Sequence, residues 1–479
     1  MFRTVGDQPS LWESLLPEEV LRLPAELARV DALLDDPVFF APFAAHFHPL
    51  IGRPSTPVEC YLRLMFLKFR YRLGYESLCA EVSDSITWRR FCRIPIDGKV
   101  PHPTTLMKLT TRCGSGAVDG LNEALWAKAA AAKLLRTSRL RADTTVVPAN
   151  VAYPTDSGLL ARAVRGIAAT GRRIQAAGGA RRTRVRDRGR AAGKRAHAIA
   201  AKLRSRAAQA KDDKQAVVAR MTGELAGLTE HAATDAQRLL ANARRALRRA
   251  EAKAAARAAA GRKDAAAGRR RGRLRRAVND LAGLLEVTRQ VAAQARQRLA
   301  GTMPDGATRR VSLHEPDARP IAKGRLGKPV EFGYKAQVTD NDDGVILDHV
   351  VEQGNPADGP QLAPAVHRVI RRTGRKPGTV TADRGYGEQA IEDDLHDLGV
   401  RYVIIPRKGK PGKARQATEH RAAFRRHVKW RTGSEGRIST LKRDYGWDRT
   451  RMDGTEGARI WTGHGILAHN LAKISALAA

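Results

Sequence analysis

The stretch from residue 157 to residue 300 contains no proline and no aromatic residue, and this absence limits what it can fold into. It consists mainly of Ala, Arg, Leu and Gln, residues that favour helix over strand. Aromatic side chains supply much of the buried area of a globular core, and here they are missing. The stretch therefore predicts either long helices or a disordered basic tether.

Apolar residues recur three and four positions apart in two parts of this stretch. One series runs from Val218 to Ala232, and the other runs from Leu281 to Leu299. This spacing is typical of paired helices that share a narrow, coiled-coil-like seam, so we expect a helical insertion over residues 157–303. The glycines in residues 171–195 predict a loose N-terminal part. The disordered tether stays open as the alternative.

The charge of the chain indicates its class of partner. Its 86 Lys and Arg against 49 Asp and Glu give a formal net charge of +37 at pH 7, and most of the excess lies in the insertion. Such a charge attracts polyanions, and counterion release then drives binding, so nucleic acid is the leading candidate partner. The sequence has no apolar run of about 18 residues, which argues against a membrane span.

The start of the chain and its cysteines indicate where the protein works. The first residues lack the charged start and apolar core of a signal peptide. The four cysteines form no CxxC pair, so we expect reduced thiols and not a zinc site or a disulfide framework. Together with the charge, these features predict a cytoplasmic, nucleoid-associated protein.

Residues 1–135 predict an N-terminal helical domain. Leu62, Met65 and Phe69 recur at helical spacing, Gly74 breaks the run, and a second helical pattern follows. This arrangement has helix-turn-helix character, and the Arg and Lys around residues 68–72 favour contact with DNA. Plain packing of helices explains the same pattern at least as well.

Residues 136–156 and 304–479 predict a mixed α/β domain. A short buried strand ends at Pro148, a hairpin surrounds the turn "DNDDG" at 340–344, and further strands stop at Asp383 and lie in "VRYVIIP". Helical patterns follow these strands, and an apolar helix closes the chain. We expect residues 136–156 to give the first strand of a sheet whose remainder, with its flanking helices, comes from residues 304–479.

Three acidic residues in this part need a partner, a metal or a role. Asp143 lies inside a buried strand, Asp383 ends another strand, and Glu435 lies among cations on a predicted helix. Carboxylates at strand ends and on a covering helix can converge at one edge of a sheet. They repel each other unless divalent cations lie between them, and their oxygens suit Mg²⁺ or Mn²⁺. Two such ions can promote phosphoryl transfer.

Cations surround the third acid at helical spacing. Arg431 precedes Glu435 by four residues and Lys442 follows it by seven, so all three lie on one face of a helix. An exposed Arg431–Glu435 ion pair, stabilising by well under about 1 kcal/mol, is the simpler interpretation of that pair alone. Arg384 and Lys335 are weaker candidates for contact with phosphate, and Lys335 is better explained as a surface cation.

A second group of acids is interpreted as structural. These residues crowd the predicted hairpin turn, where aspartate is favoured by local hydrogen bonds to the backbone: Asp340, Asp342 and Asp343.

The motifs around the three acids resemble those of bacterial insertion-sequence DDE transposases, which have a ribonuclease H-like catalytic fold. "ADTT" at Asp143 and "ADRGYG" at Asp383 resemble the two aspartate motifs. The last three positions of the Tyr-Arg-Glu-Lys signature are matched, at its spacing, by Arg431, Glu435 and Lys442. Val428 occupies the tyrosine position, which is a departure, and His427 or Trp430 are possible substitutes. Residues 56–94 resemble the N-terminal helical domain of this group, so only the basic insertion lies outside the resemblance.

The resemblance implies a homodimeric enzyme that cuts double-stranded DNA at the ends of an insertion sequence and joins them to target DNA. It implies catalytic and metal-binding roles, with two Mg²⁺ or Mn²⁺ ions, for Asp143, Asp383 and Glu435. It implies DNA contacts for Arg431, Lys442 and Arg384. A non-catalytic nucleic-acid-binding protein, and a nuclease of this fold that hydrolyses without joining, stay open. The insertion is expected to hold DNA, to pair with a second subunit, or both.

Overall fold

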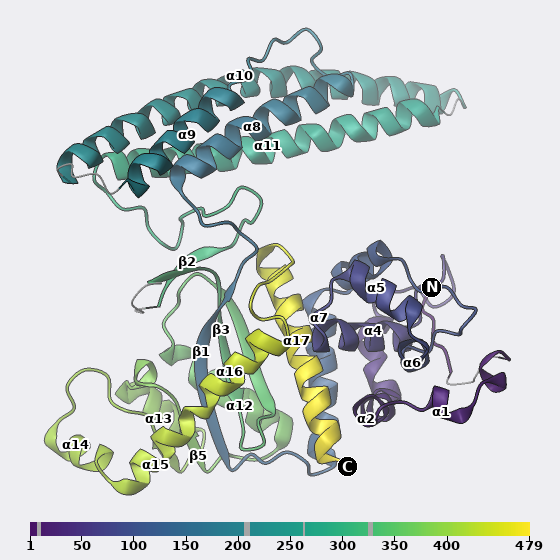
Figure 1. Ribbon diagram of the computed structural model, residues 1–479, viewed down its shortest axis with the longest axis vertical. Coiled ribbons are helices and arrows are strands. Elements are labelled where there is room, and N and C mark those ends of the chain that lie inside the picture. The colour runs from purple at the N-terminus through teal and green to yellow at the C-terminus, as the bar shows by residue number, and fades with distance from the viewer. Residues whose placement is uncertain (7–10, 206–210, 262–263, 324–328) are drawn as a thin grey trace. The chain divides into compact units, whose positions relative to one another are not determined.

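The computed structural model describes residues 1–6, 11–205, 211–261, 264–323 and 329–479 (Figure 1). The chain divides into two compact units. We call them the sheet unit, which combines Met1–Asn150 with Ile321–Ala479, and the bundle unit, which is Val151–Pro320. The bundle unit is therefore an insertion between two segments of the sheet unit.

A mixed six-stranded sheet forms the centre of the sheet unit. Its strands are β1 (Arg139–Pro148), β2 (Arg319–Ala322), β3 (Val330–Asp340), β4 (Ile346–Gln353), β5 (Thr379–Thr381) and β6 (Tyr402–Ile404). The order is β2-β3-β1-β5-β6, and β4 also pairs with β3. β3 runs antiparallel to β1 and β4, whereas β5 runs parallel to β1 and β6. The predicted mixed α/β class is confirmed, and so are the strand ending at Pro148 and the hairpin.

β1 occupies the middle of the sheet because its side chains tolerate burial on both faces. Its apolar residues, among them Leu140 and Val147, are fully buried, as expected for a central strand. The same strand also buries two charged residues, Arg141 and Asp143. Buried charges are rare without partners, so these two positions are candidates for a role beyond folding.

Helices follow the later strands as their sequence patterns predict, and two more were missed. They are α12 (Leu362–Thr373), α13 (Gln389–Asp397), α14 (Lys413–Glu419), α15 (Ala422–Arg431), α16 (Gly433–Asp444) and α17 (Gly454–Leu477). Gly374 ends α12 in the left-handed conformation, at φ 65°, which glycine adopts without strain. α14 and α15 were not predicted, because the stretch that forms them is polar and lacks a long apolar stripe.

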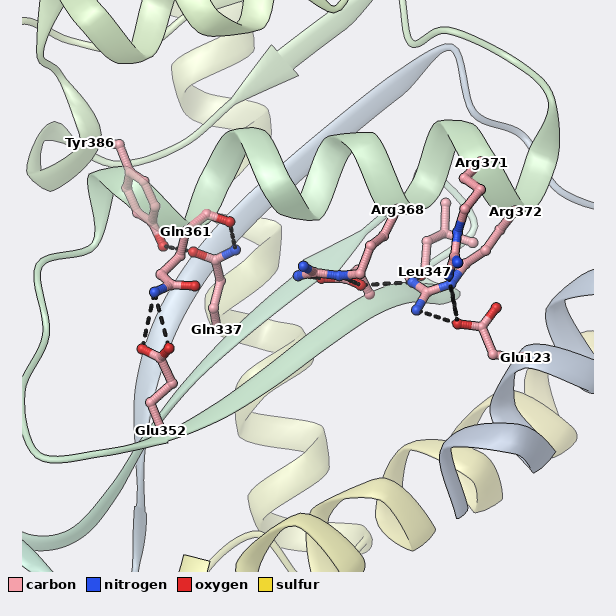
Figure 2. Close-up of polar contacts among 10 residues, drawn as sticks. Glu123, Gln337, Leu347, Glu352, Gln361, Arg368, Arg371, Arg372 and Tyr386 are labelled. Atoms are coloured by element: carbon pink, nitrogen blue, oxygen red, sulfur yellow. Dashed lines mark hydrogen bonds and ion pairs between the residues drawn. The ribbon is translucent and has the colours of Figure 1, made fainter. Parts of the chain in front are cut away.

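An ionic network fastens helices to the sheet (Figure 2). Arg368 and Arg372 of α12 both bind the Asp348 carboxylate of β4, with N–O distances of 2.7–2.8 Å. Arg372 also donates to the Leu347 carbonyl and to Glu123 of the N-terminal helix α7 (Pro103–Ala131). The network fixes α12 and α7 on β4, so its charges are structural.

The N-terminal helices belong to the sheet unit. They are α1 (Glu18–Leu21), α2 (Ala25–Leu34), α3 (Ala41–Ala44), α4 (Val58–Arg70), α5 (Tyr75–Asp84), α6 (Ile86–Phe91) and α7 (Pro103–Ala131). α4 is buried from Val58 to Phe69 and packs against α17. Its apolar spacing therefore reflects packing within this unit. No helix in the described part of the chain has the length and apolar character needed to cross a bilayer.

The bundle unit consists of four helices that enclose their own apolar core (Figure 1). They are α8 (Asp156–Ala176), α9 (Gly189–Arg204), α10 (Lys211–Ala259) and α11 (Ala265–Leu299). The expectation of a loose part over residues 171–195 is wrong where the end of α8 and the start of α9 fall in it. At Gly166 and Gly171, an added Cβ would lie 3.0 and 3.2 Å from leucine methyls of α11 and α10. Glycine in α8 thus permits close helix packing, which turns the predicted narrow seam into a core.

Candidate active site

Two of the three predicted carboxylates come from neighbouring parallel strands. Arg141 of β1 pairs with Thr381 of β5, so Asp143 and Asp383 each lie two residues beyond the same register position. Asp143 Oδ1 accepts a hydrogen bond from the Thr144 amide at 2.8 Å. Asp383 Oδ1 accepts one from the Gly385 amide at 2.8 Å, which caps a short 3-10 turn after β5. The parallel register therefore places Asp143, within β1, beside Asp383, just beyond the end of β5.

The third carboxylate, Glu435, lies in the first turn of α16, just beyond the end of α15. Thr432 between the two helices keeps helical angles, so Arg431 and Glu435 retain i,i+4 geometry. Arg431 reaches Asp143 Oδ2 at 3.2 Å and Glu435 Oε1 at 3.4 Å. The Asp143 side chain is 12% exposed and that of Glu435 is 66% exposed. The predicted ion pair exists, and it extends to a second acid.

All three carboxylates line one cavity of about 830 Å³. Its wall also includes three of the predicted cations, which are Arg431, Lys442 and Lys335. Lys335 is not the surface residue that its position suggested, because its side chain is largely buried and pairs with Asp358 at 2.6 Å. Arg384 is exposed and is not part of this wall.

The electrostatics of the cavity centre on Asp143. Burial raises the pKa of Asp143 to about 6. The Arg431 guanidinium lowers this pKa, whereas the carboxylates of Asp383 and Glu435 raise it. The Asp143 carboxyl is therefore affected by the charges of both other acids, although 240 positions of sequence separate it from Asp383 (383 − 143).

The donor set suits a divalent cation, but the described side chains are not yet arranged around one. Among the residues described, no three His, Cys, Asp or Glu side chains lie close enough together to hold an ion. The Arg431 guanidinium lies instead between Asp143 and Glu435. Three carboxylates with mutually unfavourable charge are hard oxygen ligands of the kind that Mg²⁺ or Mn²⁺ prefers. Metal binding would require Arg431 to release Asp143.

A buried ion pair that the sequence interpretation missed holds the third acid in place. Arg141 of β1 binds both oxygens of Asp340 at 3.0 and 2.8 Å, and it donates to the Trp430 carbonyl at 3.0 Å. Ser434 Oγ donates to Asp340 Oδ1 at 3.3 Å. The joint between α15 and α16 is thereby fixed to the sheet. The sequence feature that could have indicated this pair is a charged residue on each of two adjacent buried strands.

The acids of the hairpin turn are structural, as expected, but for a different reason. Local turn hydrogen bonds were predicted, whereas each carboxylate pairs with an arginine from the β1 segment. The pairs are Asp340 with Arg141, Asp342 with Arg139, and Asp343 with Arg136. They attach the hairpin to the strand that carries Asp143.

A chain of hydrogen bonds that ends on the Glu352 carboxylate supports the segment after Asp383 (Figure 2). The Tyr386 hydroxyl donates to Gln337 Oε1 at 3.0 Å, and Gln337 Nε2 donates to the Gln361 carbonyl at 3.1 Å. Gln361 in turn donates to Glu352. Because Tyr386 is fully buried, this chain anchors the turn that follows the second aspartate.

Comparison with known families identifies the class of the protein as a transposase. A "Transposase DDE domain" family model matches residues 305–471, and a "Transposase domain (DUF772)" model matches residues 14–112. The chain belongs to the DDE transposases of bacterial insertion sequences. The DDE match starts near the end of the bundle unit, after its last helix α11, so it contains Asp383 and Glu435 but not Asp143.

One similar protein comes from Rhizobium meliloti. It is the uncharacterised protein ORF8 of the nfe locus, which is 28% identical over 152 residues, covering 29% of this chain and 69% of that protein. No solved structure matches the chain.

Proposed function

We propose that this transposase cleaves DNA at the ends of its insertion sequence and joins those ends to target DNA by two-metal phosphoryl transfer. The observation that carries the proposal is the shared cavity of Asp143, Asp383 and Glu435, contributed by β1, the end of β5 and α16. The strand order, with β3 antiparallel to β1 and β5 parallel to it, supports a ribonuclease H-like catalytic domain.

In this proposal the three carboxylates hold two Mg²⁺ or Mn²⁺ ions. Such ions, when bound, stabilise the negative charge that develops on the phosphate and on the leaving oxygen. The protein's own part is to keep Asp143 and Asp383 rigid on the sheet and to bring Glu435 to them on α16. The largely exposed Glu435 is the most adjustable member of the set.

The cations have separate roles in the proposal. Arg431 balances Asp143 before the ions bind and then contacts the phosphate beside the cut, where its planar group suits two hydrogen bonds. Lys442, on the cavity wall, contacts phosphate as a point charge. Arg384, exposed outside the cavity, contacts DNA away from the cut. Trp430 is held in the Arg141 contact, so His427 is the better substitute for the missing tyrosine at Val428.

The assembly is proposed to be a homodimer on double-stranded DNA, and the bundle unit is proposed to supply much of the electrostatic attraction. Between residues 248 and 273, the described part of α10 and α11 has no buried residue and carries many exposed Arg and Lys. Cations that contribute nothing to a core remain available to a polyanion.

Cleavage and joining by active-site variants test the proposal. The DNA substrate is taken from the inverted repeats that bracket the gene, with Mg²⁺ present. We expect Asp383→Asn and Glu435→Gln to lower cleavage and strand transfer at least about a thousandfold, while DNA binding persists. Asp394→Asn is the matched control, because Asp394 is an exposed acid of α13 outside the cavity.

The two alternative functions, nuclease and non-catalytic binding protein, lead to different expected results. A nuclease of this fold would hydrolyse pre-cleaved ends without forming joined product. A non-catalytic binding protein would bind the ends but neither cut nor join them, and the substitutions would change nothing. Either result with the wild-type protein contradicts the proposal.

A further inference from the structure

A buried lysine at the end of α4 lacks an acidic partner. Lys68 is only 2% exposed. Its Nζ lies over three rings, at 4.6 Å from the Phe69 centroid, 4.7 Å from that of Tyr75 and 4.2 Å from that of Trp461. Among the described residues, no carboxylate forms an ion pair with it. Such a buried ammonium costs free energy unless an anion joins it.

A second cation, Arg451, acts on this lysine. Burial and, to a smaller extent, the Arg451 guanidinium lower the pKa of Lys68 to about 7. Arg451 is exposed and, in the described part of the chain, forms no ion pair. Lys68, Arg72 and Arg451 line one small cavity, and its acid, Asp448, already pairs with Arg72. Lys68 and Arg451 can therefore receive an anion there.

This site adjoins the catalytic cavity, because the two share lining residues. Arg72 and Asp448, an ion pair of 2.7 Å, line both the catalytic cavity and a small cavity beside Lys68. Lys68 and Arg451 line that small cavity and also a larger one of about 720 Å³. A chain that leaves the catalytic cavity along this surface therefore meets Arg72 first and then the Lys68–Arg451 pair.

The larger cavity has the lining that a nucleobase needs. Its apolar wall includes Tyr75, Met107, Met452 and Trp461, and Met107 is about half exposed although it is apolar. Three acids also lie on this wall, Glu76, Asp453 and Glu456, and Glu456 accepts hydrogen bonds from the Ser115 amide and hydroxyl. These acids suit an uncharged base in the larger cavity and leave the phosphate to the small cavity beside Lys68. Aromatic and sulfur-containing surfaces beside cations are typical of sites that bind single-stranded nucleic acid through base faces and phosphates.

We propose that Lys68 and Arg451 bind a backbone phosphate of a DNA strand that leaves the catalytic cavity, and that the adjoining cavity holds the base of that nucleotide. The inference rests on the proposed function for the direction of the strand, but the binding site itself does not depend on catalysis. The alternative is that Lys68 has only a structural role, in which its cation–π contacts with the three rings join α4, α5 and α17.

Two substitutions separate these interpretations. Lys68→Met keeps the length and apolar stem of the side chain but removes the charge. Binding of a fluorescein-labelled oligothymidylate of about 12 nucleotides is followed by anisotropy at several salt concentrations, together with the thermal midpoint of unfolding. We expect Lys68→Met to weaken binding about tenfold and to lower the salt dependence by about one phosphate contact, with an equal or higher midpoint.

Arg451→Gln should weaken binding similarly, and Arg449→Gln is its matched control. Arg449 is exposed, lies two residues away and lines none of the three cavities. For the base, an abasic oligomer of equal length should bind the wild-type protein more weakly than oligothymidylate. A lowered midpoint for Lys68→Met with unchanged affinity would establish the cation–π alternative. Equal losses for Arg449→Gln and Arg451→Gln would show diffuse attraction and overturn the proposal.

The outcome is separable from that of the proposed function. If Asp383→Asn leaves cleavage unchanged while Lys68→Met still weakens binding, the catalytic proposal fails and the phosphate site stands. If Asp383→Asn abolishes cleavage while Lys68→Met and Arg451→Gln bind normally, the phosphate site fails alone.

Discussion

The sheet unit and the bundle unit use arginine in opposite ways. In the sheet unit, the Arg141 and Asp340 side chains are 7% and 1% exposed and bind through two hydrogen bonds. In the bundle unit, the Arg275 and Glu251 side chains are 56% and 37% exposed. A buried pair fixes geometry, whereas an exposed pair contributes little to stability. The buried arginines of the sheet unit are therefore positional, because each fixes the place of a particular side chain. The exposed arginines of the bundle unit are collective, because they act through their summed charge.

The sources of stability differ accordingly. The bundle unit contains two buried apolar clusters with residues such as Leu239 and Leu281, and its described acids mostly form exposed ion pairs. The sheet unit also has an apolar core, but it adds buried networks around Asp340 and Asp348. We expect substitutions in these buried pairs of the sheet unit to be severe, and substitutions in the exposed pairs of the bundle unit to be mild.

Removal of one partner from the buried pair should have the largest effect on stability. Asp340→Asn leaves the Arg141 guanidinium buried without its counter-charge, and we expect the free energy of unfolding of the sheet unit to fall by about 3–5 kcal/mol. Hydrogen exchange in the full chain measures it, through amides of α16 and β1 compared with those of α10. Loss of protection in α10 equal to that in α16 would contradict the division between the units.

The double substitution Arg141→Met/Asp340→Leu is the control for this prediction. It replaces both charges with apolar groups, so it should recover most of the lost stability. It also removes the anchor of the joint between α15 and α16, so cleavage should stay low because Glu435 is no longer held. Full recovery of cleavage would show that the pair does not position the site.

Glycine at the same joint should show the next largest effect. A Cβ at Gly433 would overlap the Arg141 guanidinium, so Gly433→Ala forces the pair or the helix to shift. We expect a loss of about 1–3 kcal/mol, as for overpacking, and reduced cleavage. Gly436→Ala is the matched control in α16, since nothing lies within 4 Å of its added methyl. It should be neutral or stabilising, because alanine favours helix.

The contrast between these glycines explains what the sequence could predict. Both Gly433 and Gly436 look like weak points of a helix, and only the position of Arg141 distinguishes them. Strand ends, the hairpin and the spacing of Arg431, Glu435 and Lys442 follow from local pattern, so they were predictable. Contacts across hundreds of residues are not local, and this is why the Arg141–Asp340 anchor was missed.

In the bundle unit, too, local sequence pattern predicts the helices but not their tertiary packing. Its helices follow from composition, but its four-helix core depends on α8 lying against α10 and α11, which glycine at 166 and 171 permits. A glycine in an isolated sequence predicts flexibility, whereas the same glycine against a leucine permits close packing. The tertiary partner decides between these outcomes, and the sequence pattern does not contain it.

Acid should destabilise the sheet unit more than the bundle unit. His464 and His469 of α17 are buried, and burial lowers their pKa values to about 3 and about 4. Between the unfolded value of about 6.5 and about 4, the unfolded chain binds more protons than the folded one. The free energy of unfolding therefore falls as pH falls, by up to about 1.4 kcal/mol per pH unit for each histidine. Above pH 6.5 these histidines contribute no pH dependence.

Hydrogen exchange between pH 7 and pH 5 tests the acid effect. After correction for intrinsic rates, α17 amides should lose protection, whereas α10 and α11 should keep theirs, because the bundle histidines are exposed at 197, 231 and 314. Burial also lowers the pKa of His349 in β4 to about 4, so His464→Gln removes one of three such histidines and should reduce the pH slope due to them by about a third. An unchanged slope in this variant would assign the acid effect to carboxylates instead.

The smallest effect is expected for a single ion pair of the bundle unit. Arg275→Gln breaks the exposed pair with Glu251, and we expect the free energy of unfolding to change by less than about 0.5 kcal/mol. Leu281→Ala on the same helix is the positive control, because it deletes a fully buried side chain and should cost about 2–5 kcal/mol. Hydrogen exchange of α11 amides measures both. A loss for Arg275→Gln approaching that for Leu281→Ala would show that the bundle also depends on individual charges, and the distinction between positional and collective arginines would then fail.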